Sequence, residues 1–566
     1  MAQTVAWTDY SVGVQLAYAP YTKCVDMKVD ASGNVYLTYT YLGSGRVDYI
    51  TVKVGATGIL QWTAEYNGTG NGTDRAAALA VDANGNVYVT GTSMGPYGLN
   101  EFATVKYNAA GTEQWVRRYG ANGFECRAKA MAIDGAGNIY ITGITPSAND
   151  FSTKRFDDVM TLKYSSDGVL RWAVRGGSNT KADDPVGIGL DGAGNVYVAG
   201  SSVEEAAAPS GTWRVETVYL IEKYLPNGIR QWSARHIFPR GGGRHEARAM
   251  TVDAAGNTYV TGTMMLAGGS YPAYYTVKYN SSGALQWFDN YAPQDNDYSS
   301  ANAIAVSSVG NVYVTGRLSL RGVGNYYGTL KYSPTGLLLW GKYYGYGGNN
   351  EALGVAVDAS DNAYVTGLTT GSASVTTDYT TLKYHADGPQ LWVKSFNGYG
   401  KGDDRAETIV ADRAGNVFVT GTSNDGGPYY DAVTIKYAPA AGLKSPSALV
   451  PGVPNSSPLP SGAPRATGTS PTAPGPAGLA DELSAFPLPF TSATTIRFGL
   501  AADAAQARLQ VFDALGRVVA TLHEGPLTAG RRYSVQLPGA TLAAGLYVCR
   551  LSTPTTTQQI RLTRSR

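Results

Sequence analysis

The stretch Asp82-Ala-Asn-Gly-Asn-Val-Tyr-Val-Thr-Gly91 decides the fold, because close copies of it recur along most of the chain. Its second asparagine has seven counterparts, and successive members lie 51 to 62 residues apart. The eight positions are Asn34, Asn86, Asn138, Asn195, Asn257, Asn311, Asn362 and Asn416. A nearly constant period of this length indicates a repeat architecture rather than a series of unrelated domains.

Each unit contains four short runs of apolar, β-branched and aromatic residues, bounded by Gly, Asn or Asp. Such runs predict β-strands. In the second unit these strands, which we name A, B, C and D in chain order, are expected at Ala78–Val81, Asn86–Thr90, Phe102–Tyr107 and Glu113–Arg117. Four antiparallel strands in about fifty residues predict one blade of a β-propeller.

The tryptophan of strand D suggests how the repeats end. It occurs in seven units, at Trp62, Trp115, Trp172, Trp232, Trp287, Trp340 and Trp392. The eighth unit stops after strand C at Tyr437, whereas Trp7 precedes the first strand A. We therefore predict an all-β chain with an eight-bladed propeller over residues 1–437, in which the N-terminal strand completes the last blade. Closure of this kind leaves no sheet edge exposed.

These blocks resemble the bacterial SBBP β-propeller repeat family over roughly residues 5–437. The Asp-x-x-Gly-Asn-Val-Tyr-Val-Thr-Gly block also looks like the NHL repeat, and the Gly-x-x-x-Trp segment like the quinoprotein propeller repeat. The resemblance implies the fold but no particular function, because propellers carry unrelated activities.

Composition excludes several classes of protein. Charged residues are 16% of the chain and the net charge is +2, which argues against coiled coils and against a basic field for nucleic acid. The sequence contains no run of 18 or more apolar residues, so it predicts no transmembrane helix. The cysteines Cys24, Cys126 and Cys549 are too few and too far apart for a disulfide framework or a zinc knuckle. We expect a monomer with no bound cofactor or metal.

The recurring polar residues favour structural roles. Asp82, Gly85 and Asn86 are typical of a tight A–B turn, and calcium binding is the alternative. The lysine of strand C occurs in all eight units and is expected to form a salt bridge that builds the blade. His236, His245 and Glu246 share one D–A connection, so a metal site there is a further alternative.

The B–C loops differ in every unit, whereas the A–B and C–D turns are short and repetitive. The variable loops span residues 145–158, 201–216, 264–275, 318–327 and 423–431. Variable loops on a fixed scaffold are where binding sites are usually built. Their aromatic residues are the predicted ligand-binding set, which suits sugars or protein surfaces: Trp213, Tyr97, Tyr271, Tyr274, Tyr326, Tyr327, Tyr429 and Tyr430. The alternative is that these rings only pack down over the loops. Trp213 is the preferred candidate because it lies in the longest loop, outside the tryptophan column of the repeat.

The D–A connections are expected to reach the same face, near the mouth of the central channel. They carry a predicted polar ring that could hold a cation or a polar ligand: Asp74, Arg75, Asp183, Asp184, Glu246, Asp404 and Arg405, with Glu125, Arg127, Glu351 and Asp403 nearby. A network of salt bridges between blades is the alternative.

Two segments follow the repeats. Residues 438–480 are rich in Pro, Ser, Thr, Gly and Ala, which predicts an extended linker. Residues 481–566 return to short strands and predict a small Ig-like β-sandwich.

The C-terminal segment resembles the type A sorting domain of the type IX secretion system of Bacteroidetes-like bacteria. The motifs that carry the resemblance are Pro-x-Pro-Phe, Thr-Thr-Ile-Arg-Phe, Asp-x-Leu-Gly-Arg and Ala-Gly-Leu-Tyr. Leu488 stands where the family usually has Asn. Their sorting residues here are Pro487, Pro489, Phe490, Gly516, Arg517, Gly545 and Tyr547. The resemblance implies export to the cell surface or the medium by that machinery, followed by removal of the domain.

The chain start shows no secretory signal, because Met1 is followed directly by Ala2-Gln3-Thr4. Together with the sorting motifs this predicts a mature extracellular form. We expect a non-enzymatic scaffold that binds extracellular carbohydrate or protein through the B–C loops. The alternative is an extracellular propeller enzyme of the quinoprotein, lyase or glycosidase type.

Overall fold

The structure is a computed structural model, and it describes residues 3–9, 23–43, 46–120, 125–146, 157–177, 182–207, 213–238, 245–265, 271–293, 298–345, 348–370, 376–398, 402–424, 430–439, 482–486, 493–500, 502–513, 517–528, 532–543, 545–554 and 557–564. The chain divides into two compact units, residues 1–463 and 464–566, and each is considered by itself.

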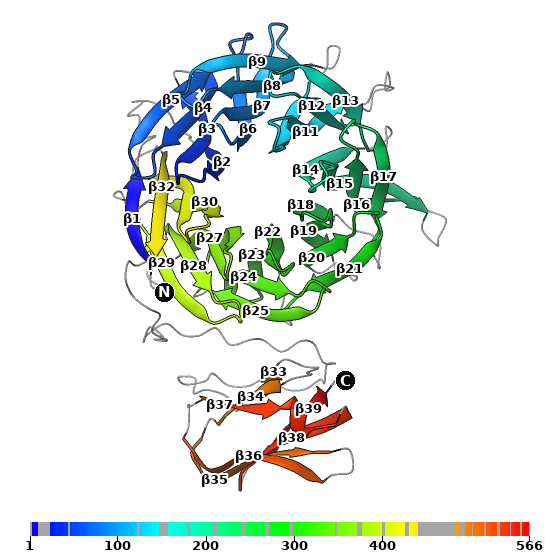
Figure 1. Cartoon of the computed structure of the whole chain (residues 1–566), viewed down its shortest axis with the longest axis vertical. Helices are drawn as coiled ribbons and strands as arrows, with labels where there is room; N and C mark the ends of the chain where they lie inside the picture. Colours follow the sequence, from blue (N-terminus) through cyan, green and yellow to red (C-terminus); the bar gives the residue numbers. More distant parts are fainter. Residues whose placement is uncertain are drawn as a thin grey trace. The chain divides into compact units, whose positions relative to one another are not determined.

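Eight four-stranded antiparallel sheets make up the described part of the first unit, arranged as a ring (Figure 1). We number them by the repeat that supplies strand A. Sheet 1 consists of β2 (Lys23–Val29), β3 (Val35–Gly43), β4 (Arg46–Val54) and β5 (Leu60–Tyr66), and sheet 2 of β6 (Asp74–Val81), β7 (Val87–Met94), β8 (Asn100–Tyr107) and β9 (Glu113–Tyr119). Sheet 3 consists of β10 (Arg127–Ile133), β11 (Ile139–Pro146), β12 (Asp157–Tyr164) and β13 (Leu170–Arg175), and sheet 4 of β14 (Asp183–Leu190), β15 (Val196–Ala207), β16 (Trp213–Tyr224) and β17 (Arg230–His236).

Sheet 5 consists of β18 (Glu246–Val252), β19 (Thr258–Met265), β20 (Pro272–Tyr279) and β21 (Leu285–Tyr291), and sheet 6 of β22 (Ser300–Val306), β23 (Val312–Leu320), β24 (Gly324–Tyr332) and β25 (Leu338–Tyr344). Sheet 7 consists of β26 (Glu351–Val357), β27 (Ala363–Thr370), β28 (Thr377–Tyr384) and β29 (Gln390–Phe396), and sheet 8 of β30 (Asp404–Ala411), β31 (Val417–Asn424), β32 (Tyr430–Pro439) and β1 (Gln3–Asp9). In each sheet strand A lies nearest the centre of the ring and strand D forms its outer edge (Figure 1). The prediction of an all-β, propeller-like unit with strands A to D in this order is confirmed.

The N-terminal strand β1 completes the last sheet, as the tryptophan count predicted. It pairs antiparallel with β32, with Gln3 opposite Pro439 and Trp7 opposite Lys436. In sheet 2 the same pairing places Trp115 opposite Lys106. The two ends of the repeat region are therefore joined in the register that strands C and D use elsewhere.

Neighbouring sheets are held by a contact that recurs around the ring, which we call the latch. In sheet 2, Lys106 Nζ donates to the backbone carbonyl of Ser166 in the next C–D turn at 2.9 Å, and Trp115 Nε1 donates to the same oxygen at 3.4 Å. The latch lysines Lys53, Lys106, Lys163, Lys223, Lys278, Lys331 and Lys436 all donate to such a carbonyl at 2.7–3.3 Å. The last of them bonds to Ala56 and so links sheet 8 to sheet 1.

The expectation that these lysines form salt bridges is largely wrong. Of the eight strand C lysines, only Lys331 and Lys383 contact a carboxylate of the described residues. Every latch lysine instead lies over an aromatic ring of strand B, as Lys106 does over Tyr88 at 5.1 Å. A backbone carbonyl and a ring face satisfy the ammonium group without the second charge that a buried pair would need to desolvate.

The latch is different where the chain ends meet. In the other sheets strand C ends at a tyrosine, or at Val54 in sheet 1, and the turn then presents its carbonyl, whereas β32 continues to Pro439 in order to pair with β1. Trp392 Nε1 consequently finds no acceptor among the described residues. Lys383 bonds to the hydroxyl of Tyr364 at 2.5 Å and lies 3.4 Å from Asp358.

The A–B turns are built by an aspartate that only accepts. Asp82 Oδ1 accepts from the backbone N–H groups of Asn84 and Asn86, and its Oδ2 accepts from the Asn86 amide and the Tyr88 hydroxyl. The same arrangement, apart from small variations, occurs at Asp30, Asp134, Asp191, Asp253, Asp358 and Asp412. Because donors surround this carboxylate, the turn interpretation is supported and a calcium loop is not.

Sheet 6 lacks this aspartate, and sheet 7 supplies a replacement. Ser307 stands at the turn position, and Asp361 of the next sheet reaches across to Asn311 at 2.8 Å and Lys331 at 2.6 Å. Asp361 has a φ of 63° at the position where the other A–B turns have glycine. The left-handed backbone of Asp361 is unfavourable, but this conformation places the Asp361 carboxylate next to the buried Lys331, and the contact compensates for the strain.

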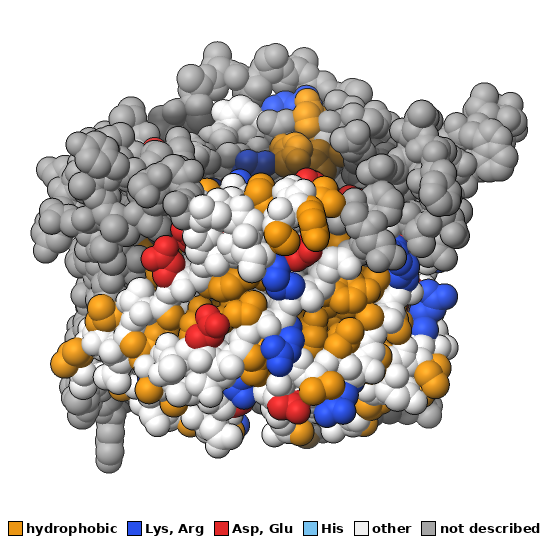
Figure 2. Space-filling view, turned by 90° about the horizontal axis from the view of Figure 1, so that it is seen from above, with side chains coloured by type: hydrophobic (Ala, Val, Ile, Leu, Met, Phe, Trp, Pro, Cys, Tyr) orange, Lys and Arg blue, Asp and Glu red, His pale blue; other side chains and the backbone are white. Residues whose placement is uncertain are grey.

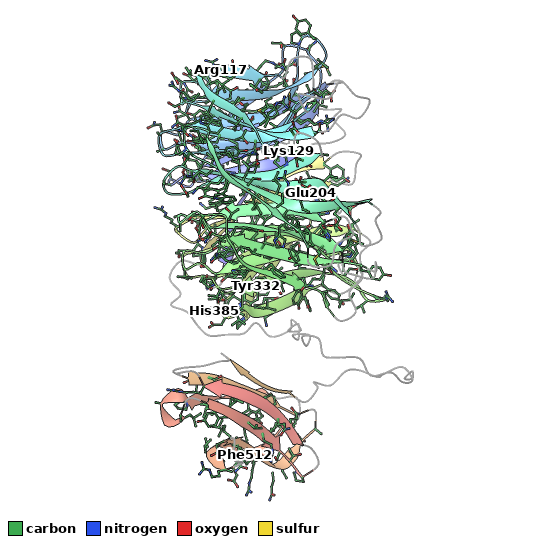
Figure 3. The ribbon with its side chains drawn as sticks, turned by 90° about the vertical axis from the view of Figure 1, so that its right-hand side faces the viewer. Arg117, Lys129, Glu204, Tyr332, His385 and Phe512 are labelled. Atoms are coloured by element: carbon green, nitrogen blue, oxygen red, sulfur yellow. The ribbon has the colours of Figure 1, made fainter. Side chains whose placement is uncertain are left out.

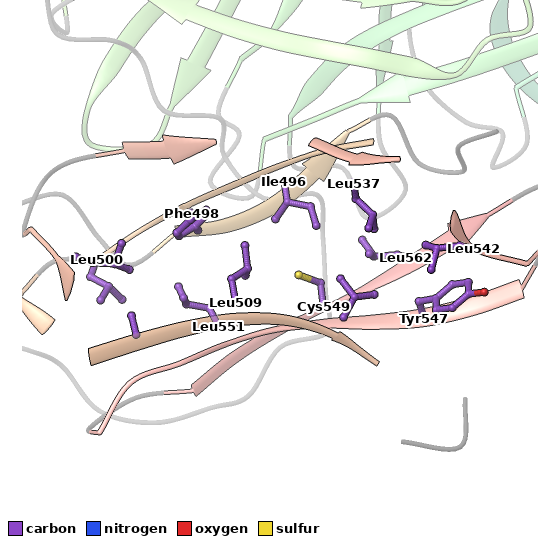
Figure 4. Packing of buried hydrophobic residues seen from close by; sticks show 13 residues of the cluster. Ile496, Phe498, Leu500, Leu509, Leu537, Leu542, Tyr547, Cys549, Leu551 and Leu562 are labelled. Carbon is purple, nitrogen blue, oxygen red and sulfur yellow. The ribbon is translucent and has the colours of Figure 1, made fainter. Parts of the chain in front are cut away.

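The second unit has two sheets around its own core (Figure 4). One contains β33 (Glu482–Phe486), β34 (Ala493–Gly499) and β37 (Arg532–Pro538); the other contains β36 (Val518–Leu527), β35 (Ala504–Phe512), β38 (Gly545–Ser552) and β39 (Thr557–Arg564). Ile496, Phe498, Leu509 and Leu551 are buried between them. A single 3₁₀ turn, Gly539–Thr541, is the helical element in the described ranges, and no helix there is long and apolar enough to cross a membrane.

Three of the predicted sorting residues have structural contacts or positions in this unit. Arg517 donates through Nε to Asp513 at 2.8 Å and closes the β35–β36 connection, while the Tyr547 hydroxyl donates to the Ala543 carbonyl. Gly545 begins β38. Pro487, Pro489, Phe490, Gly516 and most of the predicted linker, residues 438–480, lie outside the described residues.

We predict that Asp361→Gly destabilises the protein by about 1–3 kcal/mol, because Lys331, whose side chain is 5% exposed, loses its carboxylate while the backbone gains only about 1 kcal/mol from relief of the positive φ. Ser307→Asp should restore most of this loss when combined with Asp361→Gly, since it recreates the turn of the other sheets. Urea unfolding of the two single variants and the double variant measures the coupling. Additive effects would show that the two positions do not share one role.

Candidate functional site

The two faces of the ring differ in what they carry. A–B and C–D turns lie on one face, and B–C and D–A connections on the other; in Figure 3 the C–D turn residue His385 and the strand B residue Glu204 lie toward opposite faces. On the outer wall seen in Figure 2, charged side chains are scattered among apolar and uncharged ones.

A bulge in each strand A directs side chains into the centre. The register of every A–B pair shifts by one residue, as between Ala128 and Ala130 in sheet 3. The residue at the bulge, Lys129 there, lines a central cavity of about 1130 Å³. Its counterparts Val25, Val186, Arg248, Asn302, Leu353 and Glu407 line the same cavity. A bulge that turns side chains toward an axis is a recurrent way to build a site.

Charges of opposite sign are paired across this cavity. Lys129 lies 3.0 Å from Asp184, and Arg248 lies 3.1 Å from Glu246. Arg248 also donates to Asn302, which donates to Glu351 at 3.0 Å. Lys129–Asp184 is an ion pair between sheets 3 and 4, whereas sheets 5, 6 and 7 are joined through the neutral Asn302, so these contacts match the alternative of a salt-bridge network between blades only in part. Exposed pairs of this kind contribute little stability.

The predicted polar ring is only partly assembled in this cavity. Asp184, Glu246 and Arg405 line it, together with Glu351. Arg75, Glu125, Arg127 and Asp403 are exposed and do not line it. Asp74, Asp183 and Asp404 are buried, so their assignment to the channel mouth is wrong.

Asp74 shows why these aspartates are buried. Its Oδ2 accepts from the Gly68 N–H at 2.6 Å, and its Oδ1 accepts from the Met94 N–H at the end of strand B at 3.1 Å. His245, Ser299 and Asn350 occupy the same position in sheets 5, 6 and 7, and each accepts from the N–H twenty residues ahead. We call this position the strand-B cap. Sequence reasoning missed it because four residue types fill it and share only an acceptor atom.

Two predicted binding aromatics are also buried. Tyr274 and Tyr327 are at most 1% exposed, and their hydroxyls donate to the carbonyls of Gly328 and Thr380 in the following sheets. Tyr379 makes the same contact with Val433. These tyrosines form a packing column at the start of strand C, so their prediction as ligand-binding residues is wrong.

The other predicted aromatics vary in exposure. Tyr97 is 90% exposed. Tyr271, Tyr326 and Tyr430 are half-buried, and Arg321 lies over the ring of Tyr271 at 5.0 Å. Tyr429 and the side chain of Trp213 lie outside the described residues. The alternative that the loop aromatics only pack down therefore holds for some positions and not for Tyr97.

Much of the predicted loop that carries Trp213 is strand. β15 and β16 extend to twelve residues each, and Trp213 pairs with Ala207 at the loop end of the hairpin, which projects beyond the ring in Figure 1. Alternating residues such as Glu204 and Glu216 face one another across the two strands. The long spacing of this repeat thus comes from hairpin extension, and only residues 208–212 connect the strands.

His236 and His245 form a buried aromatic cluster rather than a metal site. His236 contacts the hydroxyls of Tyr279 at 2.9 Å and Tyr275 at 2.7 Å through its two nitrogens. His245 stacks on Phe238 at 3.7 Å, and its Nδ1 accepts from the Met265 N–H. No group of three metal-ligating side chains occurs in the part of the chain that the structure describes. Burial lowers the pKa of both histidines to about 4.

Comparison with known proteins agrees with the fold. Residues 61–98 and 114–151 match the family model of the SBBP beta-propeller repeat. Each match begins in strand D of one sheet and runs through strands A and B of the next. The chain is therefore a β-propeller repeat protein.

Similar solved structures include a protein of unknown function from Dyadobacter fermentans, at 13% identity and a TM-score of 0.32, covering 56% of this chain and 96% of that one. PorZ, a surface component of the type IX secretion system of Porphyromonas gingivalis, has 12% identity and a TM-score of 0.29, covering 95% and 74%. The propeller domain of the Trilobed protease from Pyrococcus furiosus has 8% identity and a TM-score of 0.37, covering 68% and 98%. No curated protein matches the chain.

We predict that the protein loses stability as the pH falls from 6.5 to 4. The folded state holds His236 and His245 neutral down to a pKa of about 4, whereas the unfolded chain binds protons near 6.5, so acid favours unfolding by on the order of 2 kcal/mol per histidine. Thermal unfolding at pH 7.5 and 5.0 measures this loss. His236→Gln/His245→Asn should flatten it, and the exposed His385→Asn should not. An equally steep pH dependence in the double variant would exclude the buried pair as its source.

Proposed function

We propose that the chain is a secreted or cell-surface scaffold without enzymatic activity, and that it binds an extracellular carbohydrate or protein through its B–C loop face. In this proposal the eight sheets are the blades of one closed eight-bladed propeller. The observation that supports it most is the difference between the two faces of the ring: one carries the repeated turns, and the other carries the varied connections and the central cavity.

The repeated face has little left to offer a ligand. Its turn aspartates accept from neighbouring donors, and its latch lysines and tryptophans donate to turn carbonyls. The opposite face holds the exposed Tyr97 and the central cavity with its charged lining. Varied loops around a polar cavity, on a scaffold that satisfies its own repeated groups, are typical of binding proteins.

We further propose that the second unit is an Ig-like sorting domain of the type IX secretion system. The motifs described above support this assignment. The unit also has its own hydrophobic core, which is consistent with a sorting domain that folds independently. The Asp513–Arg517 contact gives the Asp-x-Leu-Gly-Arg motif a structural reason within the domain.

The binding face is tested with a glycan array and a panel of immobilised extracellular proteins. Tyr97→Ala/Tyr271→Ala/Tyr430→Ala should weaken binding at least tenfold, because stacked aromatic rings are common binding hot spots, and should leave the melting temperature nearly unchanged. The matched control is Ile59→Ala/Ile229→Ala/Leu337→Ala, three exposed residues of the C–D turns. Equal losses in both variants would refute the assignment of the face, and turnover of a glycosidase, lyase or dehydrogenase substrate would refute a purely binding role.

Export is tested by fusing residues 481–566 to a reporter that carries a Sec signal, in a host with a type IX system. We expect the reporter at the cell surface or in the medium. Arg517→Ala, which removes the contact with Asp513, is expected to reduce export. Retention of the parent fusion in the periplasm, or equal export from a host that lacks the system, would overturn the sorting assignment.

A further inference from the structure

One corner of the central cavity differs from the rest of its lining. It lies where sheet 4 meets sheet 5, and it is lined by Asp184, Ser201, Thr217, His245, Glu246 and Arg248. Sheet 4 carries the longest B–C hairpin in the described ranges, and the D–A connection that follows it runs from His236 at the end of β17 to His245 just before β18. The irregular features of the repeat thus meet at one place.

His245 has a polar atom that its structural role leaves unused. As a strand-B cap it needs one acceptor, and Nδ1 provides it. At the same position both side-chain oxygens of Asp74 accept backbone N–H groups, and the Asn350 amide donates to the Asn325 carbonyl at 2.8 Å. His245 Nε2 has no partner among the described residues, although the residue is only 2% exposed and lines the cavity.

The Nε2 nitrogen of His245 is a hydrogen-bond donor in a fixed orientation. Because Nδ1 accepts a backbone N–H, the neutral ring carries its proton on Nε2. Burial, with a smaller contribution from His236, lowers the pKa of His245 to about 4 and keeps the ring neutral at physiological pH. Stacking on Phe238 at 3.7 Å holds the orientation of the ring. A buried donor without an acceptor costs free energy unless a ligand supplies one.

Arg248 adds a second buried donor, and the neighbouring carboxylates supply acceptors. Its terminal nitrogens bond to Glu246 and Asn302, whereas its Nε is buried and has no partner in the part of the chain that the structure describes. Asp184 and Glu246 are each 58% exposed at the side chain, and each already has a cation beside it. The corner therefore offers donors and acceptors side by side, with no net charge.

We propose that this corner binds a neutral saccharide unit, with His245 Nε2–H and Arg248 Nε–H donating to sugar oxygens and Asp184 and Glu246 accepting sugar hydroxyls. A neutral polyhydroxylated ring can serve as donor and acceptor at once, whereas an anion or cation would have to compete with the Lys129–Asp184 or Arg248–Glu246 pair. The cavity, at about 1130 Å³, has the volume of a small-molecule site. The inference deepens the proposed carbohydrate binding and rests on it.

The test uses the full chain and calorimetric titration with methyl glycosides of glucose, galactose, mannose and N-acetylglucosamine, and with glucuronate as the charged counterpart. His245→Asn retains the cap acceptor, as Asn350 does in sheet 7, but removes the open nitrogen. We expect the parent to bind at least one neutral sugar and His245→Asn to bind it at least tenfold more weakly with a similar melting temperature. Ligand should also shift the ¹⁵N resonance of His245 Nε2.

Ser299→Ala is the matched control, because it removes the strand-B cap of sheet 6 away from this corner. It should lower the melting temperature and leave the affinity unchanged. Binding of glucuronate alone, or equal affinity in His245→Asn, overturns the inference. If polysaccharides are captured but no monosaccharide binds, this inference fails and the proposed function stands; if neither glycans nor proteins are captured, both fail.

Discussion

In six of the C–D turns that the structure describes, one backbone carbonyl accepts two hydrogen bonds from the sheet before it, and the packing of the ring depends on this shared acceptor. The lysine of strand C and the tryptophan of strand D approach it from the same side, as Lys278 and Trp287 approach Pro334. The turn must come very close to the tryptophan, since a Cβ on Gly336 would lie 2.5 Å from its ring. Gly336 also has a φ of 87°. Lys, Trp and Gly recur in the sequence because all three meet at this junction.

The same contact explains how a ring can be closed by a chain with two ends. The bond from Lys436 to Ala56 makes the junction of sheets 8 and 1 like the others. The junction of sheets 7 and 8 loses a hydrogen bond in return, because β32 continues in order to pair with β1 and no C–D turn in the described residues presents a carbonyl to Trp392. Closure by strand pairing therefore replaces one latch with a backbone ladder. This exchange is favourable because it covers an entire strand edge.

Positions with one role and many residue types were the hardest to predict. The strand-B cap is an aspartate, a histidine, a serine or an asparagine, because only an acceptor atom is required there. The carboxylate that completes the sheet 6 turn comes from Asp361, which is in another repeat and in a position that reads as an imperfect glycine. Tyr274 and Tyr327 were predicted as binding residues because they were placed within the variable loops 264–275 and 318–327, yet strand C begins earlier than the pattern suggested. Each error has the same cause, since contacts between sheets are not periodic within one repeat.

The sequence by itself determined the number and order of the strands in each unit, the pairing of the N-terminal strand with the last repeat and the structural use of the turn aspartates. These features follow from local alternation, turn chemistry and a counted repeat, which are all properties of neighbouring residues. Only the tertiary structure decided which polar side chains reach the central cavity, because neighbouring residues of a strand face opposite sides of the sheet: Asp183 is buried, whereas Asp184 lines the cavity. It also decided that His245 Nε2 has no partner among the described residues, since that depends on Met265, Phe238 and the junction of two sheets at once.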